Sequence, residues 1–406
     1  MAVISIQHIG PLIDTGSISL SRFNIVIGKQ STGKSTFLKI LSYCQWLEKQ
    51  IMITEDKRVL ANYTHYNRFI KELKQFHRLS DSFFSEKSRI FYEGEGVYIY
   101  YQGDKKNAQI LKKTDFDKIR HNTKLSFIPS ERNLISAIKN IDRAYRTNEN
   151  DSFINHLFEW SNAKEHSSEK QPVDLSVVAN MEYYYDGAND MDYIKLKDLN
   201  KKISPYHASS GVQSVLPIMV MTKYFTSDKL FDNVDFNKFE ISKFLRILAA
   251  NNSKDDSIKE VSEKYSAMHK YRNTRLFIEE PEQNLFPESQ QALIQFLVNR
   301  INRATAYTNT ESSLTLTTHS PYIITAFNVM LLAAQALKID KDRTSEIISP
   351  ELAIPLEQVS AFFITEDGEF QDIVDKELYM ISGLELDHAS TIVDEQLSIL
   401  NDIIYG

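Results

Sequence analysis

A loop that combines glycines, lysines and several hydroxyl residues lies near the start of the chain. Its core, GKQSTGKS, fits the pattern of Gly, four residues, Gly, Lys, then Ser or Thr. Glycines let the backbone N–H groups point at phosphate oxygens, the lysine adds positive charge at the outer phosphates, and the last hydroxyl can ligate Mg²⁺. An apolar strand precedes the loop and a helix follows, as the motif requires. We therefore expect phosphate binding by Gly28, Lys29, Gln30, Ser31, Thr32, Gly33, Lys34, Ser35 and Thr36.

Two adjacent carboxylates, Glu279 and Glu280, end the apolar segment TRLFIEE. We expect a strand there, so both lie at its carboxyl end, where ligands of α/β folds bind. One carboxylate can hold a metal ion through its waters while the next polarises an attacking water. The alternative is a solvated acidic turn before Pro281, and the phosphate loop elsewhere in the chain favours the catalytic interpretation.

A histidine, His319, follows a further apolar strand in SLTLTTHSPYI. Seen alone, it is an ordinary histidine at a strand end. Beside a bound triphosphate, it can hydrogen-bond the γ phosphate and the attacking water. One expected helix and one expected strand separate it from the glutamate pair, which suits the neighbouring strand of the sheet.

The elements that must position these residues alternate between strand and helix in the last third of the chain. This alternation predicts a parallel sheet covered by helices, and so an α/β fold. Short antiparallel strands are expected at the N-terminus, in RIFYEGEGVYIYYQG and in residues 181–204, and exposed helices over residues 38–79. The expected units are a core of 1–41 and 205–372, an inserted lobe of helices and antiparallel strands over 42–200, a helical insertion over 227–272 and a C-terminal helical segment over 373–406.

Composition and charge restrict the class of protein. The net charge of -7 argues against a surface that binds nucleic acid everywhere, although KKTDFDKIRHNTK can be either a solvated face or a local groove for nucleic acid. The single cysteine, Cys44, excludes an internal disulfide. The N-terminus lacks the pattern of a secretion signal, and the apolar segment from Ile323 is too short to span a bilayer. We expect a soluble, cytoplasmic protein without a membrane partner.

Taken together, these segments resemble the head of ABC-type ATPases. GKQSTGKST, SSGVQS, LFIEEPEQNLFP and TTHSPYI occur in the order of that family. The closest likeness is to prokaryotic AAA family ATPases, which share the head architecture of the SMC and RecF ATPases and of the OLD-family nucleases. The resemblance implies an α/β, ABC-type P-loop NTPase head with a mixed sheet, antiparallel N-terminal strands and inserted, mainly helical lobes.

The resemblance also implies a role for individual residues. Residues 28–36 would be the Walker A loop that binds ATP with Mg²⁺, and Ser35 and Glu279 would be associated with the metal. Glu280 would be the general base and His319 the switch histidine. The signature segment, which completes the ATP site of a partner, would comprise Ser210, Gly211 and Gln213. Without its companions, SSGVQS is a commonplace helix start with serine at the cap.

Some features depart from the usual pattern of this family. GKQ replaces Gly-Pro-Asn, Glu279 is one methylene longer than aspartate, and Val212 replaces the second glycine of transporters. These departures are compatible with slow hydrolysis. The D-loop would be residues 284–287, and Gln102 is a candidate for the glutamine-bearing loop. The sequence assigns no role to Arg132 in IPSER.

Several functions are compatible with such a head. We expect a homodimer or higher homo-oligomer that works with a separately encoded effector, such as a nuclease, as in antiviral systems of the PARIS or Septu kind. A RecF- or SMC-like ATPase in DNA repair or DNA binding is the alternative. An OLD-like nuclease is disfavoured because the sequence after His319 shows no acidic metal cluster, and a transporter ATPase because the usual LSGGQ is missing.

Overall fold

A six-stranded sheet forms the centre of the protein, and it runs in the order β16-β15-β4-β14-β13-β8. The computed structural model describes residues 2–53, 57–105, 107–138, 141, 151–232 and 270–383. The strands of this central sheet are β4 (Phe23–Gly28), β8 (Asn122–Ile128), β13 (Tyr271–Glu279), β14 (Ser313–Thr318), β15 (Val359–Ile364) and β16 (Phe370–Asp372). All pairs are parallel except that of β15 with β16, so the sheet is mixed, as the sequence predicts.

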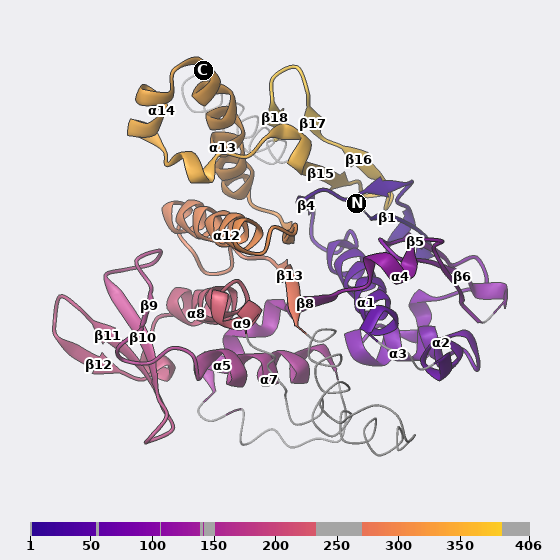
Figure 1. Ribbon diagram of the computed structural model, residues 1–406, viewed down its shortest axis with the longest axis horizontal. Helices are drawn as coiled ribbons and strands as arrows, with labels where there is room; N and C mark the ends of the chain where they lie inside the picture. Colours follow the sequence, from indigo (N-terminus) through magenta and orange to yellow (C-terminus); the bar gives the residue numbers. More distant parts are fainter. Residues whose placement is uncertain are drawn as a thin grey trace, which may run out of the picture.

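Helix α1 (Lys34–Ile53) lies between the central sheet and a second, N-terminal sheet (Figure 1). Phe37 and Leu41 are fully buried in a core that also contains Phe277 of the central sheet and Ile6 of the N-terminal sheet. The expectation of exposed helices over residues 38–79 is therefore wrong for α1. A helix that is covered on two sides needs apolar residues around most of its circumference, and FLKILSYCQWL provides them.

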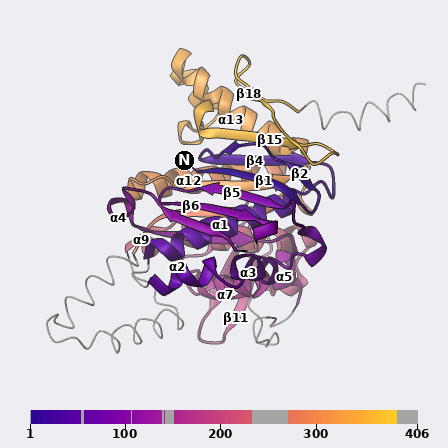
Figure 2. The same cartoon turned by 90° about the vertical axis from the view of Figure 1, so that its right-hand side faces the viewer.

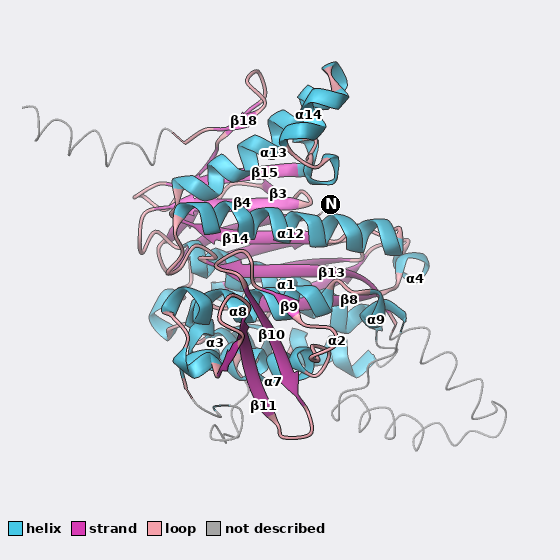
Figure 3. Cartoon of the chain, turned by 90° about the vertical axis from the view of Figure 1, so that its left-hand side faces the viewer, coloured by secondary structure: helices cyan, strands magenta, loops and turns pink. Residues whose placement is uncertain are grey.

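Helices cover the other face of the central sheet, as Figures 1 and 3 show. They are α7 (Ser152–Lys164), α8 (Ser210–Phe225), α12 (Pro287–Thr308) and α13 (Pro321–Ile339). Alternate strand residues such as Ile25, Ile278 and Leu316 point into this second core. The sheet is therefore buried on both faces, which is typical of parallel sheets.

Helix α7 is a core helix, although polar residues flank it on both sides in the sequence. Phe153, Leu157 and Trp160 are buried against the helices and strands of this core. Asp151 caps the helix, because its carboxylate accepts hydrogen bonds from the N–H groups of Phe153 and Ile154. The apolar residues of SFINHLFEW recur at helical spacing. The polar residues on either side of this segment make that helical pattern hard to recognise in the sequence.

The N-terminal sheet is antiparallel and runs in the order β2-β1-β5-β6-β7, with β3 also beside β1. Its strands are β1 (Val3–Ile9), β2 (Leu12–Asp14), β3 (Ile18–Ser19), β5 (Arg89–Glu93), β6 (Val97–Gln102) and β7 (Gln109–Lys112). Figure 2 shows β1, β5 and β6 side by side. The hairpin expected in RIFYEGEGVYIYYQG is confirmed as β5 and β6.

The turn of this hairpin holds a buried carboxylate of α1. Glu48 is 3% exposed and accepts hydrogen bonds from the Tyr92 hydroxyl at 2.6 Å and the Gly96 N–H at 2.8 Å. A Cβ atom at Gly94 would lie 2.2 Å from the Glu48 Oε1 atom, so this position requires glycine. The contact joins α1, and therefore the phosphate loop before it, to the N-terminal sheet.

We expect Glu48→Ala to lower the free energy of unfolding by about 3 kcal/mol, because it removes the carboxylate that accepts hydrogen bonds from the buried Tyr92 hydroxyl and the buried Gly96 N–H. Urea unfolding followed by circular dichroism measures this change. The exposed Glu86→Ala should shift the free energy by less than about 0.5 kcal/mol. Equal stabilities for the two variants would show that the buried contact contributes nothing.

The remaining described elements lie outside the two large sheets. A third sheet in the order β12-β11-β10-β9 projects beside α7 and α8 (Figure 3). Its strands are β9 (Val173–Asp174), β10 (Met181–Asp186), β11 (Met191–Leu196) and β12 (Lys201–Ile203), and β17 (Val374–Asp375) pairs with β18 (Met380–Ile381). The shorter helices include α2 (Lys57–Thr64), α3 (Arg68–His77), α4 (Phe116–Ile119), η3 (Ser130–Asn133), α5 (Leu134–Ala137), α9 (Asp228–Asp232) and α14 (Lys341–Ile347).

The expected domain boundaries do not follow the sheets. Residues 42–200 are not one inserted lobe, because β8 is a strand of the central sheet and β5 to β7 complete the sheet begun by β1. Single-sequence patterns could not show these pairings, since the partners are far apart in the chain. Most of the expected insertion at 227–272 lies outside the described residues. Most of the expected helical segment at 373–406 also lies outside the described residues. The described residues of that segment include the β17–β18 hairpin.

Helix α13 runs from Pro321 to Ile339 and is long and apolar enough, by length and composition only, to cross a membrane, so the expectation that this segment is too short is wrong. The core helix of a soluble protein passes the same test. In this fold Ile323, Phe327 and Met330 are fully buried in the core on the face of the central sheet that α12 and α13 cover.

Candidate functional site

The expected catalytic residues come together at one edge of the central sheet. The strands β4, β14 and β13 are neighbours and parallel, so their carboxyl ends meet at this edge. Thr318 pairs with Ile27, and Glu279 pairs with Thr317, which places the phosphate loop, His319 and the glutamate pair at the same level. The expectation that His319 follows the strand next to the glutamates is confirmed.

Two glycines shape the phosphate loop between β4 and α1. Gly33 has a φ of 107°, a conformation that side chains rarely adopt, and a Cβ atom there would lie 2.6 Å from the Leu12 side chain. At Gly28, a Cβ atom would lie 2.8 Å from the Thr32 hydroxyl. The loop thus packs too closely for larger residues at both positions, and α1 begins directly after it at Lys34.

The Lys34 ammonium lies over the loop that it follows. Its Nζ atom donates hydrogen bonds to the carbonyls of Gly28 at 2.7 Å and Lys29 at 2.6 Å. Burial lowers the pKa of Lys34, while the carboxylates of Glu280 and Glu282 oppose this shift. The ammonium group is therefore held between the loop and the acidic residues that follow β13.

Glu279 has the features of a residue that holds a cation. It is 2% exposed, and its Oε2 atom accepts a hydrogen bond from the Ser130 N–H at 3.1 Å. Its Oε1 atom is buried without a hydrogen-bond partner among the described residues. An orphaned buried carboxylate oxygen beside a phosphate loop fits a Mg²⁺ ion, which prefers oxygen ligands and retains several waters. Ser35, in the first turn of α1, is the hydroxyl that the motif assigns to the same ion.

Glu280 is held in a strained backbone conformation. Its φ is 43°, in the left-handed region, which costs about 1–3 kcal/mol for a residue other than glycine. Its N–H donates to the Thr317 carbonyl at 3.0 Å. The side chain is 27% exposed, in contrast to the buried Glu279, so it can reach solvent and a ligand. Adjacent residues of a strand point to opposite faces, and this turn lets both carboxylates serve one site.

A third carboxylate at this edge belongs to Glu282. The sequence assigns it no role, although it lies within LFIEEPEQNLFP. It is 5% exposed, and its Oε1 atom accepts hydrogen bonds from the Thr318 hydroxyl at 2.7 Å and the His319 N–H at 2.9 Å. The His319 Nδ1 atom lies 3.3 Å from the same oxygen and 4.0 Å from the Glu280 Oε1 atom. Glu282 therefore orients His319 toward Glu280.

The expected signature residues lie on α8, beside Asn284 of the expected D-loop of the same chain. A Cβ atom at Gly211 would lie 2.9 Å from the Asn284 carbonyl oxygen, and the Asn284 amide donates to the Ser214 hydroxyl at 2.8 Å. Ser210 is exposed at the start of the helix. The Gln213 amide donates to the carbonyls of Pro205 and Tyr206, so its side chain braces the turn before α8.

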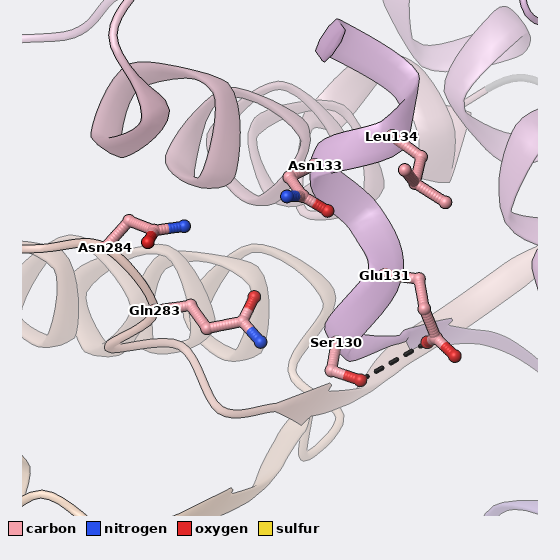
Figure 4. A pocket seen from close by; sticks show the side chains of 6 residues that line it. All are labelled: Ser130, Glu131, Asn133, Leu134, Gln283 and Asn284. Carbon is pink, nitrogen blue, oxygen red and sulfur yellow. Dashed lines mark hydrogen bonds between the residues drawn. The ribbon is translucent and has the colours of Figure 1, made fainter. Parts of the chain in front are cut away.

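An open cavity of about 340 Å³ lies at the same edge, between η3 and the D-loop. Its lining residues are Ser130, Glu131, Asn133, Leu134, Gln283 and Asn284. Figure 4 shows the side chains of Gln283 and Asn284 across this cavity from those of η3. Gln102, the candidate for the glutamine-bearing loop, instead ends β6 opposite Arg89 in the N-terminal sheet.

The basic segment that suggested a nucleic-acid groove is largely engaged within the protein. Lys113 pairs with Glu93, and Lys124 pairs with Glu159. Arg120 donates to the Met52 carbonyl. These contacts favour a structural role for the segment.

A model of one protein family matches residues 23–325, more than half of the chain. Its description is "AAA domain, putative AbiEii toxin, Type IV TA system". The chain belongs to this family of AAA ATPases. No curated protein matches it.

Solved structures that match this chain include SMC head domains and RecF. The SMC head domain from Thermotoga maritima is 8% identical, with 91% of this chain and 97% of that chain covered and a TM-score of 0.35. The Smc head domain bound to the C-terminal domain of ScpA, derived from Pyrococcus furiosus, is 9% identical, with coverages of 97% and 99% and a TM-score of 0.38. The recombination mediator protein RecF is 9% identical, with coverages of 91% and 97% and a TM-score of 0.30. Because these TM-scores are low, the assignment of the chain to the AAA family rests on the match to the family model and on the topology of the sheets.

Proposed function

We propose that this chain binds and hydrolyses ATP with Mg²⁺, dimerises through shared ATP sites, and acts as the sensor or scaffold for a separately encoded effector in anti-phage defence. The observation that carries the ATPase part is the meeting of three loops at one sheet edge. The phosphate loop, the glutamate pair and His319 follow the neighbouring strands β4, β13 and β14. The buried, orphaned oxygen of Glu279 supports a metal ion at this edge.

Each residue of the edge has a distinct task in this proposal. The backbone N–H groups of residues 28–36 and the Lys34 ammonium bind the phosphates. Ser35 and Glu279 would hold Mg²⁺, which would neutralise phosphate charge when it is bound. Glu280 accepts the proton of the attacking water, and His319, oriented by Glu282, hydrogen-bonds the γ phosphate.

The dimer part of the proposal rests on the surface around the start of α8. Ser210 is exposed there. Tyr206, four residues before it, is 49% exposed, and Phe286, two residues after the Asn284 that Gly211 contacts, is 77% exposed. Exposed aromatic side chains are enriched where proteins meet. The N–H groups at the start of a helix bind anions, so this surface can close over the γ phosphate of a second copy. ATP would then join two heads, and hydrolysis would release them.

The defence part of the proposal is supported by the family description, which names a putative AbiEii toxin of a type IV TA system. Across the described residues, no group of three or more His, Cys, Asp or Glu side chains is placed to hold a metal ion. The described part of the chain therefore supports an ATP site and shows no acidic or His/Cys cluster of the kind that a metal-dependent nuclease uses. A RecF-like DNA-binding ATPase is less well supported, because Lys113, Arg120 and Lys124 are engaged internally.

We expect Mg-ATP to drive dimerisation of a Glu280→Gln protein and Ser210→Arg to weaken that association about 100-fold, because it places an uncompensated charge in the closed interface. Light scattering on a size-exclusion column measures the oligomeric state. Ser345→Arg, on the exposed side of α14, is the matched control and should dimerise normally. Dimerisation of the Ser210→Arg protein at unchanged ATP concentration would contradict the shared site.

A further inference from the structure

Arg132, in η3 directly after β8, is a fully buried arginine. Arginine is almost never fully buried unless its charge and its N–H donors are satisfied internally. Burial lowers the pKa of Arg132 to about 10, although the carboxylates of Glu282 and Glu279 oppose this shift, so the side chain stays a cation near neutral pH. Its neighbour His156 is buried and neutral, since burial and the Arg132 charge lower the pKa of His156 to about 3.

The Arg132 guanidinium binds backbone carbonyls from separate parts of the site. Its Nη1 atom donates to the Glu279 carbonyl at 2.7 Å, and its Nη2 atom donates to the Glu280 carbonyl at 2.7 Å. Its Nε atom donates to the carbonyl of Ser214 in α8 at 3.0 Å, and Nη1 also reaches the Pro129 carbonyl at 3.3 Å. A planar fork with several fixed donors suits this task, and a lysine does not.

The hydrogen bonds of Arg132 to the Glu279 and Glu280 carbonyls fix the strained turn at Glu280. The N–H of Glu280 is bound by the Thr317 carbonyl, and its carbonyl is bound by Arg132. A positive φ at a non-glycine residue persists only where the surroundings determine it. Arg132 therefore fixes the direction in which the Glu280 side chain leaves the backbone.

The hydrogen bond from the Arg132 Nε atom to the Ser214 carbonyl holds the first turns of α8. Ser214 is held at its carbonyl by Arg132 and at its hydroxyl by Asn284 of the D-loop. Gly211 packs directly on the Asn284 carbonyl. Arg132 thus connects the first turns of α8 to the backbone of Glu280.

We propose that Arg132 is a positioning residue that sets the orientation of Glu280 and couples it to α8 of the same chain. The inference rests on the proposed function, in which Glu280 is the general base and α8 meets a second copy. Closure of that copy onto α8 then aligns Glu280 for hydrolysis in the first chain. The coupling makes hydrolysis at one site depend on the interface that serves the other.

The test compares Arg132→Lys with Arg300→Lys. Arg300 of α12 is a matched control, because it also binds backbone carbonyls of α8. It donates to the carbonyls of Lys223 and of Thr226, the residue that caps the C-terminal end of α8, opposite the end that Arg132 contacts. We expect Arg132→Lys to lower kcat about 100-fold, the scale of a misplaced catalytic group, with a KM for ATP within about threefold of wild type. Arg300→Lys should change neither parameter by more than about threefold.

Hydrogen–deuterium exchange of the protein without ATP supplies the second readout. Arg132→Lys should speed exchange in residues 279–284 and 210–216 together, whereas Arg300→Lys should do so only near residues 222–232. If Arg132→Lys does not fold, Arg132→Met, which avoids a buried ammonium, replaces it with the same expected results.

An unchanged kcat in the Arg132 variant, or faster exchange in only one of its two segments, would overturn the proposal. An equal loss of kcat in both variants would also overturn it, because it would indicate general loosening of α8. If the wild-type protein hydrolyses no ATP, the proposed function fails, and the exchange pattern still decides whether Arg132 couples the two segments.

Discussion

Glu280→Gln is expected to bind Mg-ATP as the wild type does and to hydrolyse it at least about 100-fold more slowly. The amide keeps the size of the side chain but cannot accept the proton of the attacking water, and removal of a general base costs about 10²–10⁴-fold. The backbone of residue 280 is held by Thr317 and Arg132, so the substitution leaves the turn in place. Phosphate release under saturating ATP measures the rate, and titration with a fluorescent ATP analogue measures binding.

The matched control for this variant is Glu288→Gln in the first turn of α12. Glu288 is exposed and lies eight positions further along the same acidic segment. Its turnover should stay within about twofold of wild type. If Glu280→Gln turns over as fast as this control, Glu280 is not the base, and Glu279 becomes the candidate.

Lys34→Ala is expected to reduce the affinity for Mg-ATP at least about 100-fold, since it removes the loop cation that the motif aims at the β and γ phosphates. The variant also loses the contacts of the ammonium with the Gly28 and Lys29 carbonyls. Isothermal titration with Mg-ATP measures the affinity, and circular dichroism confirms the fold.

Lys341→Ala is the matched control for that measurement. Lys341 is also the first residue of a helix, α14, but it is exposed and no phosphate loop precedes it. Its affinity for Mg-ATP should equal that of wild type. Unchanged affinity in Lys34→Ala would mean that the loop is not a nucleotide site.

The sheet edge could be predicted from the sequence because its signals are local. GKQSTGKS, TRLFIEE and SLTLTTH each join an apolar strand to polar residues, and the carboxyl ends of parallel strands meet. The positions of Lys34, Glu279 and His319 around one edge follow from these patterns alone. Their chemical roles are part of the proposed function.

The contacts that brace this edge could not be predicted, because they join residues far apart in the chain. Arg132 reaches carbonyls 82 and 147 positions away, at Ser214 and Glu279. Backbone carbonyls leave no trace in the residue types of a sequence. Pairing of β8 with β13 is likewise non-local, and it places residues expected in an inserted lobe inside the core sheet.

We claim that ATP is hydrolysed at a site that two chains share. A mixture of Lys34→Ala and Ser210→Arg chains tests whether hydrolysis needs both chains. Each variant alone should be inactive, because every site in its homodimer lacks either the loop lysine or the partner's helix start. A mixed dimer keeps one intact composite site. An equal mixture should therefore recover about a quarter of the wild-type rate, since half of the dimers are mixed and each has one of two sites. Normal hydrolysis by Ser210→Arg alone, or no recovery while mixed dimers demonstrably form, would contradict the claim.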